Sequence, residues 1–228
     1  ATTNLRVTLN FYKWLEDKKI GRLIYSSTSE VYSGAEKVGL LEIPTCEAAP
    51  VVFSQPTDVR YSYGTSKFMG EFLTLHFSKQ FNTETSVIRY HNIYGPRMGN
   101  KHVIPEFMIR MKGGETPFNL YGGEETRSFC YVNDAIEATF EVGRSAKCAG
   151  EIIHIGNSSI EIKISDLAKA MMQIMKVDYP IVENGSKSSS VKRRCPDTSK
   201  LNKLTGFTAK ISLEQGLEET LDWYSKNY

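Results

Sequence analysis

The sequence lacks the features that mark metal-binding proteins. Its 228 residues include only four cysteines, Cys46, Cys130, Cys148 and Cys195, and no two of them form a CxxC pair. Paired histidines are absent as well, so we expect no metal site. So few cysteines in a chain of this size are typical of a reduced, cytoplasmic protein rather than a disulfide-stabilised one.

Long apolar runs and a strong net charge are also absent. No stretch is apolar over the roughly 20 residues that a membrane-spanning helix needs, and the first residues lack the order of a signal peptide. The net charge is +2, and the one basic cluster, VKRR at 191–194, is too short for a nucleic-acid-binding tail. We therefore expect neither a membrane nor a nucleic acid as a partner.

A phosphate-binding glycine turn is missing too. Nowhere does a strand run into a GxGxxG-type turn, which holds the pyrophosphate of a dinucleotide in Rossmann-type folds. The glycine pairs at 113–114 and 122–123 follow a helix and a short edge-like segment, and we interpret them as ordinary turns. If the fold binds a dinucleotide, the segment that holds its phosphates is expected to lie outside this sequence.

Apolar periodicity along the chain alternates between that of helices and that of strands. We expect helices at 4–19, 62–81, 103–114, 133–143, 164–175 and 212–227, and strands or strand-like segments at 22–27, 85–95, 118–123, 151–156 and 179–183. Strands that alternate with helices of this length indicate an α/β fold with a parallel sheet and crossover helices.

The stretch RYSYGTSK, residues 60–67, places Lys67 four residues after Tyr63 in an expected helix. Residues at this spacing share one helix face. The ammonium group of a lysine beside a phenol favours the phenolate, which acts as a general base toward a substrate hydroxyl. The same spacing also occurs by chance in many helices, so the pair alone leaves a purely structural interpretation open.

Four further motifs occur with this pair. In chain order the motifs are LIYSSTSEVYSG at 23–34, the Tyr63–Lys67 stretch, VIRYHNIYGPR at 87–97, GGEETRSFCYVNDAIEA at 122–138 and RRCPDTSKLNKLTGF at 193–207. Together they resemble the extended short-chain dehydrogenase/reductases, specifically the NAD-dependent epimerase/dehydratase family of nucleotide-sugar enzymes. The resemblance covers the whole chain, and it makes a featureless α/β domain a poor alternative.

The resemblance implies the C-terminal part of a Rossmann-type doubly wound parallel sheet with a smaller α/β substrate-binding region. Residues 1–100 would be the remainder of the NAD-binding domain, and residues 101–228 would be mainly the nucleotide-sugar-binding region. Family members begin with roughly 90–100 residues that carry the glycine-rich turn. We therefore expect either a fragment or a protein that has lost this half, and weak NAD binding by this chain alone.

Residue roles follow from the resemblance. Thr28 is expected to bond the sugar hydroxyl that is oxidised, Tyr63 to act as the base, and Lys67 to hold the nicotinamide ribose. The cofactor NAD is expected at a set that comprises Ser26, Ser27, Tyr63, Lys67, Tyr90 and Asn92. His91 stands where an aromatic residue is more usual in the family.

Nucleotide-sugar contacts follow in the same way. The expected substrate-binding residues are Ser29, Arg60, Asn92, Asn119, Tyr121, Arg127 and Arg194. Arg127 would clamp the diphosphate, which suits its five donors; the structural alternative is a pair with Asp134.

Glu30 bears on the reaction that follows oxidation at sugar C4. It matches the glutamate of 4,6-dehydratases and of uronate decarboxylases, whereas a solvent-facing loop carboxylate is the structural alternative. Arg60 and Arg194 resemble arginines of decarboxylases, although Arg194 is also a common phosphate contact. The sequence therefore favours dehydration or decarboxylation slightly, and leaves open a 4-epimerase or an inactive remnant that only binds a nucleotide sugar or a partner.

Two apolar helices predict a homodimer. The expected helix at 4–19 carries Leu5, Leu9, Tyr12 and Leu15 on one side and Val7, Phe11 and Trp14 on others. The helix at 62–81 is apolar almost all round, through Phe68, Met69, Phe72, Leu73, Leu75 and Phe77. Such a helix needs cover on every face. In the family the two helices pair with their copies in a second subunit; cover by other elements of the same chain is the alternative.

Overall fold

The structure is a computed structural model, and it describes residues 2–53, 57–59, 61–186 and 191–227. Its central element is a parallel sheet with the strand order β1 (Arg22–Thr28), β2 (Glu84–Tyr90) and β7 (Ile152–Ile155). Ile88 and Ile153 are completely buried, as expected for a parallel sheet that is covered on both faces. The carboxyl ends of β1 and β2 lie side by side, with Thr28 paired to Tyr90.

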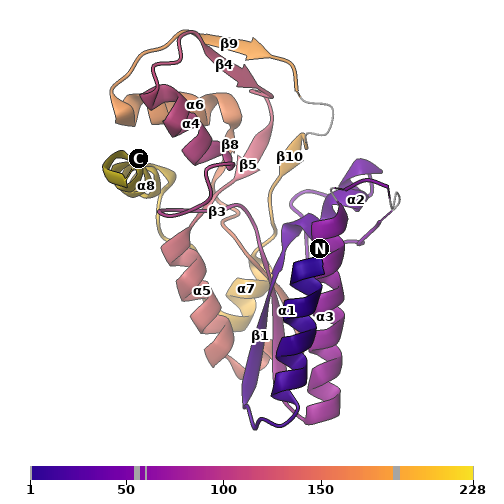
Figure 1. Cartoon of the computed structure of the whole chain (residues 1–228). Helices are drawn as coiled ribbons and strands as arrows, with labels where there is room; N and C mark the ends of the chain where they lie inside the picture. Colours follow the sequence, from indigo (N-terminus) through magenta and orange to yellow (C-terminus); the bar gives the residue numbers. More distant parts are fainter. Residues whose placement is uncertain (1, 54–56, 60, 187–190, 228) are drawn as a thin grey trace.

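Helices cover both faces of this sheet. Figure 1 shows α1 (Thr2–Leu15) and α3 (Tyr61–Phe81) side by side along β1, and α5 (Val132–Arg144) and α7 (Ser199–Thr205) on the opposite side. The prediction of a Rossmann-type α/β fold with parallel strands is thereby confirmed.

A second region is built around the largest apolar core. Helices α4 (Val103–Lys112), α6 (Ile164–Met175) and α8 (Leu213–Asn227) pack there against β4 (Phe118–Tyr121), which runs parallel to β9 (Ile181–Asn184). Strand β7 comes after α4 and β4 in the chain but belongs to the central sheet. Residues after 100 therefore contribute to both the central sheet and the second region. The division of the chain at residue 100 stays a prediction.

Short strands connect the two regions. They are β3 (Ile93–Tyr94) parallel to β6 (Cys130–Tyr131), and β5 (Thr126–Ser128) between β10 (Arg193–Arg194) and the antiparallel β8 (Glu161–Lys163). Strand β10 brings a segment from near the end of the chain toward the carboxyl edge of the central sheet (Figure 1).

Expected and observed elements differ mainly at their ends. Helix α6 has the expected bounds, whereas α1 ends at Leu15 because the next four residues, EDKK, offer no apolar side chain to bury. The expected strand at 85–95 is interrupted after Tyr90, since Asn92 adopts φ 43°. The pattern did not predict the short helices η1 (Ser29–Tyr32), α2 (Ser33–Lys37), η2 (Ala146–Cys148) and α7.

Two further observations concern only the described residues. None of their helices is both long and apolar enough to span a bilayer. No group of three or more His, Cys, Asp or Glu side chains among them is arranged to hold a metal ion.

Candidate active site

A cavity of about 700 Å³ lies at the carboxyl ends of β1 and β2. Ligands of open α/β sheets bind at this edge. Its lining includes Thr28, Ser29, Glu30, Tyr63, Tyr90, Asn92, His102 and Arg194. The cavity therefore brings together residues from β1, η1, α3, β2 and β10, which are far apart in the chain.

Thr28 ends β1 and begins the turn that carries Glu30. Its backbone is extended, with φ −151°, and its hydroxyl oxygen accepts a hydrogen bond from the backbone N–H of Glu30 at 3.2 Å. This N-cap holds the turn in place. The hydroxyl hydrogen of Thr28 is not used by that bond, so it remains available for a substrate oxygen.

Tyr63 and Lys67 lie in the first turns of α3. The helix approaches η1 closely at Gly64, where a Cβ would lie 2.7 Å from the carbonyl oxygen of Glu30. A larger residue at this position would push Tyr63 away from Thr28. The Tyr63 side chain is 44% exposed and lines the cavity.

Lys67 is held by two groups of β1. Its ammonium donates a hydrogen bond to the carbonyl oxygen of Ser26 at 2.9 Å and lies 5.3 Å above the ring of Tyr25. Burial lowers the pKa of Lys67 from its usual value. A half-buried cation is thus fixed one helical turn from Tyr63.

Arg194 binds two carboxylates beside Thr28. Its guanidinium forms an ion pair with Glu30 at 2.6 Å and a longer one with Glu36 at 3.5 Å. Burial by itself lowers the pKa of Arg194, but Glu30 and Glu36 outweigh it and raise the pKa above its usual value. Glu30 therefore binds a partly buried arginine, with 28% of its own side chain exposed, and its action on a substrate stays a prediction.

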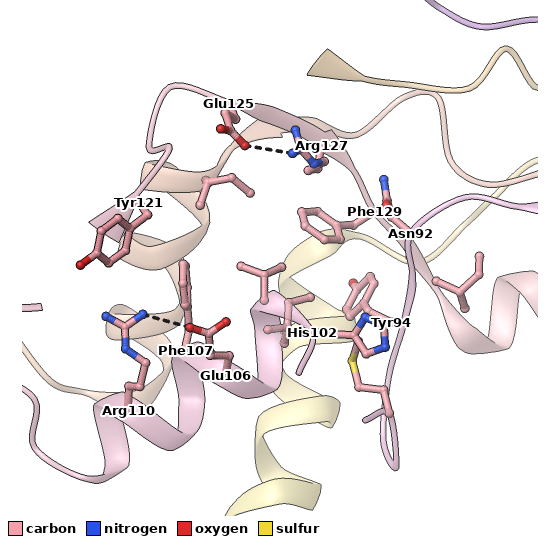
Figure 2. A pocket seen from close by; sticks show the side chains of 15 residues that line it. Asn92, Tyr94, His102, Glu106, Phe107, Arg110, Tyr121, Glu125, Arg127 and Phe129 are labelled. Atoms are coloured by element: carbon pink, nitrogen blue, oxygen red, sulfur yellow. Dashed lines mark hydrogen bonds and ion pairs between the residues drawn. The ribbon is translucent and has the colours of Figure 1, made fainter. Parts of the chain in front are cut away.

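A second cavity of about 250 Å³ adjoins the first and shares Asn92, Ile93 and His102 with it. Figure 2 shows Arg110 and Tyr121 at one end of it and Arg127 with Glu125 at another.

Arg127 pairs with Glu125 at 2.9 Å, and burial, with the charge of Arg194, lowers the pKa of Arg127. Asp134 instead accepts backbone hydrogen bonds from Lys210 and Ile211, so the pair of Arg127 with Asp134 is wrong.

Of the other expected site residues, some line the cavities and others do not. Asn92 donates from its side chain to the carbonyl oxygen of Ser128, and the Tyr90 hydroxyl is hydrogen-bonded to Thr139 at 2.8 Å. Asn119 lies outside the lining of both cavities, and its carbonyl oxygen accepts from Arg110.

Ser26 and Ser27 differ in their surroundings. Ser26 presents its carbonyl oxygen to Lys67, whereas the buried Ser27 hydroxyl donates to Glu71 behind the sheet, away from the cavity. Arg60 lies outside the described residues.

Two cavity residues escaped the sequence reasoning. His102 precedes α4 and lines both cavities. Arg110 lies in the last turn of α4 and lines the second cavity, and its guanidinium lies 4.3 Å from the centre of the Phe118 ring. Their only signal was a polar residue just before an otherwise apolar helix and a basic residue in its last turn, and many surface residues share these signals.

Comparisons with known proteins point to one enzyme family. The model of the NAD dependent epimerase/dehydratase family matches residues 1–156. The chain is 32% identical over 219 residues to the UDP-N-acetyl-alpha-D-glucosaminuronate decarboxylase of Bacillus cytotoxicus, covering 92% of this chain and 65% of that protein. It is 28% identical over 223 residues to the human dTDP-D-glucose 4,6-dehydratase, covering 93% of this chain and 59% of the relative. The chain thus spans less than two thirds of these curated relatives.

A solved structure shares the fold over nearly the whole chain. The UDP-glucuronic acid 4-epimerase of Bacillus cereus, in complex with UDP-glucuronic acid and NAD, superimposes with a TM-score of 0.84 at 26% identity, covering 99% of this chain and 68% of that one.

Proposed function

Because the chain belongs to the NAD-dependent epimerase/dehydratase family, we propose that the whole protein oxidises a nucleotide sugar at C4 and then performs either 4,6-dehydration or decarboxylation of a uronate. Relatives of this chain are named as a decarboxylase, a dehydratase and an epimerase, so they support oxidation at C4 as the common first step. Their names alone do not favour one of the later steps.

The cofactor of the family fits the residues around the cavity. NAD, when bound, accepts a hydride from sugar C4. Nicotinamide cofactors of this fold class bind at the carboxyl edge of the sheet, which is surrounded here by Lys67, Ser26, Tyr90 and Asn92. Lys67 would offer its ammonium hydrogens to ribose hydroxyls. A half-buried lysine with a lowered pKa suits a site that also receives a positively charged ring.

Tyr63 and Thr28 both act on the sugar C4 hydroxyl in the first step. The Tyr63 phenolate takes the proton of the sugar C4 hydroxyl, and the Thr28 hydroxyl donates a hydrogen bond to the same oxygen. Lys67 stabilises the phenolate by its charge. The support is that Thr28 and Tyr63 line one cavity, with Gly64 allowing the close approach of their elements.

Glu30 is the observation that favours elimination-type chemistry. A ketone at C4 makes the C5 proton acidic, and the Glu30 carboxylate lies in the same cavity as Thr28 and Tyr63. In dehydration Glu30 would take the C5 proton, and the C6 hydroxyl would leave as water with a proton from solvent. The hydride held by the cofactor would then return to C6, and C5 would take back a proton that has exchanged with solvent, which gives the 4-keto-6-deoxy sugar. In decarboxylation the C6 carboxylate leaves as carbon dioxide, and C5 is then protonated; Arg194 would face that carboxylate.

A 4-epimerase is the second candidate. The ion pair of Glu30 with Arg194 supports it, because a carboxylate that serves only to hold an arginine is not needed as a base. An epimerase re-reduces the ketone from the other face and needs only Thr28 and Tyr63.

The second cavity is proposed to hold the nucleoside diphosphate. Arg127 would bind diphosphate oxygens, a role that suits a guanidinium, and Tyr121 would flank the base. Asn119, on the same strand as Tyr121 but outside the cavity lining, is proposed as a further contact of the base. Arg60 and Ser29 are proposed as further sugar contacts.

The deciding experiment uses the full-length protein with NAD in deuterated water. UDP-, dTDP- and GDP-hexoses and their uronates serve as substrates. A 4-keto-6-deoxy product that contains solvent deuterium indicates dehydration, and carbon dioxide release from a uronate indicates decarboxylation. A C4 epimer without deuterium, formed equally by Glu30→Gln, would refute elimination-type chemistry.

We also propose that two copies pair through α1 and α3. Val7, Trp14, Met69 and Phe72 on these helices are between 49% and 62% exposed, so the described residues of the same chain do not cover them. An apolar face of this kind suits a self-complementary interface between two copies.

A further inference from the structure

A row of polar side chains crosses the central sheet behind the candidate active site. Ser27 on β1, Arg89 on β2 and His154 on β7 are neighbours in register, and all three are buried. Successive side chains of a strand point to opposite faces, so these three lie on the face opposite to Thr28 and Tyr90.

Glu71 on α3 neutralises the charge of Arg89, the charged member of this row. The Arg89 guanidinium donates two hydrogen bonds to the Glu71 carboxylate, at 2.9 and 2.6 Å, and the Ser27 hydroxyl donates to the same carboxylate at 2.5 Å. Glu71 follows Lys67 by one helical turn. The pair thus ties the helix that carries Lys67 to the two strands whose ends form the cavity.

Tyr32, the last residue of η1, extends the chain of bonds. Arg89 donates to the Tyr32 oxygen. The Tyr32 hydroxyl lies 2.8 Å from Nε2 of His154 and farther, 3.4 and 3.5 Å, from the carbonyl oxygens of Cys46 and Glu47, so His154 is its nearest acceptor.

His154 then carries its hydrogen on Nδ1 and donates it to the carbonyl oxygen of Asp197 at 3.3 Å. Burial raises the pKa of Tyr32 to about 12 and lowers the pKa of His154 to about 3, so both are neutral at neutral pH. The Asp197 carbonyl can only accept, and this assigns the hydrogen of His154 to Nδ1.

The last acceptor belongs to the segment that carries Arg194. Asp197 donates its backbone N–H to Thr45 at 2.7 Å, and Thr45 donates to Cys195 at 2.9 Å. The neighbouring Glu47 carboxylate accepts the backbone N–H of His154 at 2.9 Å. The Arg194 segment is therefore bound by the backbone of Thr45 and by the ring of His154, and Glu47 in turn binds the backbone of His154.

We propose that Tyr32 is a positioning residue that couples the turn carrying Glu30 to the segment carrying Arg194. Glu30 and Tyr32 share the single turn η1, so a shift of that turn moves both. Through His154, Tyr32 is connected to Asp197, three residues after Arg194.

Without the Tyr32 hydroxyl, the buried Nε2 of His154 loses its donor, and Nη1 of Arg89 keeps only its bond to the carbonyl oxygen of Glu47 at 3.3 Å. The turn that carries Glu30 and the segment that carries Arg194 would then no longer be connected through His154.

Amide hydrogen exchange of the full-length protein tests this coupling without any substrate. Tyr32→Phe keeps the ring and removes the hydroxyl. We expect exchange of the Thr45 and Asp197 amides to become about tenfold faster, while amides of α6 stay unchanged. The matched control is Tyr61→Phe, because the buried Tyr61 hydroxyl has no hydrogen-bond partner within the described part of the chain. Equal exchange at Thr45 and Asp197 in the two variants would overturn the inference.

Turnover provides a second readout, and this arm rests on the proposed function. We expect Tyr32→Phe to lower kcat about tenfold with little change in KM, but to lower kcat less than about twofold in an Arg194→Lys background. A purely structural role would produce the same factor in both backgrounds and would contradict the proposal. If no nucleotide sugar is turned over, the proposed function fails while the exchange result still decides the coupling. If Tyr32→Phe does not fold, His154→Gln breaks the same connection at Asp197 and carries the same expectations.

Discussion

Arg194 and Glu30 are separated by 164 residues in the chain and form an ion pair of 2.6 Å in the wall of the candidate active site. Glu36 lies on the other side of the same guanidinium at 3.5 Å. Arg194 therefore faces the cavity with its charge already shared by two carboxylates. An anionic substrate group bound beside Arg194 would compete with Glu30 for this guanidinium.

Glu30→Gln tests the catalytic part of this pair. Glutamine keeps the shape and can still accept a hydrogen bond from Arg194, but it cannot take a proton from sugar C5. In the full-length protein we expect formation of the elimination product to fall about 100-fold or more, measured by product analysis in deuterated water. Glu36→Gln is the matched control, since Glu36 binds Arg194 but does not line the cavity, and it should stay within about threefold of the wild type. Equal losses in the two variants would argue for a purely structural role of Glu30.

Tyr63→Phe removes the proposed base and keeps the ring. Turnover is expected to fall about 100-fold or more, and the affinity for the nucleotide sugar to change little, because Arg127 and Asn92 are unaltered. Steady-state kinetics and calorimetry measure the two quantities. Full activity of Tyr63→Phe would show that the base lies elsewhere.

Tyr25 holds Lys67 through the contact of its ring with the ammonium at 5.3 Å. Replacement by leucine should lower turnover by about two- to fivefold, the loss expected for a cation–π contact of this kind. Tyr25→Phe keeps the ring and should retain nearly the wild-type rate. Equal rates of the leucine and phenylalanine variants would show that the ring does not position Lys67.

His91 is expected to make the protein less stable in acid. The residue is fully buried, and neither ring nitrogen has a hydrogen-bond partner among the residues that the structure describes. Burial, with the neighbouring His154 ring, which would oppose a second proton beside it, and the positive charges of Arg194 and Arg89, lowers the pKa of His91 well below the usual value. Below about pH 6.5 the unfolded chain therefore takes up a proton on His91 that the folded protein does not, and the free energy of unfolding falls as the pH falls.

His91→Phe removes this contribution. We expect the variant to be more stable than the wild type, with a gain that grows from pH 7 to pH 5 by up to about 1.4 kcal/mol per pH unit. Urea denaturation at both pH values measures it, and the exposed His76→Gln serves as control. A gain that does not depend on pH would mean that His91 titrates normally in the folded protein.

The pairing of two copies is tested by charge on α3. Phe72→Glu combined with Leu75→Glu should produce monomers, or insoluble protein with exposed apolar surface, because the two charges would be buried in the interface. Sedimentation at micromolar concentration measures the assembly. Val182→Glu, at an exposed apolar residue of β9, should leave it unchanged. A monomeric wild type would refute the proposal.

The sequence by itself determined the features that depend on neighbours within about one turn. The spacing of Tyr63 and Lys67 placed both on one face of α3, and the periodicity of residues 164–175 predicted the bounds of α6, because local hydrogen bonds and the burial of one face follow directly from the order of residues. The order of the motifs likewise pointed to the family before any geometry was known.

Only the tertiary structure decided which distant charges meet. Glu125 rather than Asp134 binds Arg127, and Arg194 reaches Glu30, because strands from distant parts of the chain converge at one edge of the sheet. The buried bonds of Tyr32 to Arg89 and His154 arise in the same way, from three elements packed in register. A sequence pattern records neighbours along the chain, whereas these partners are chosen by how the strands and helices pack, and each side chain has several possible partners until that packing is complete.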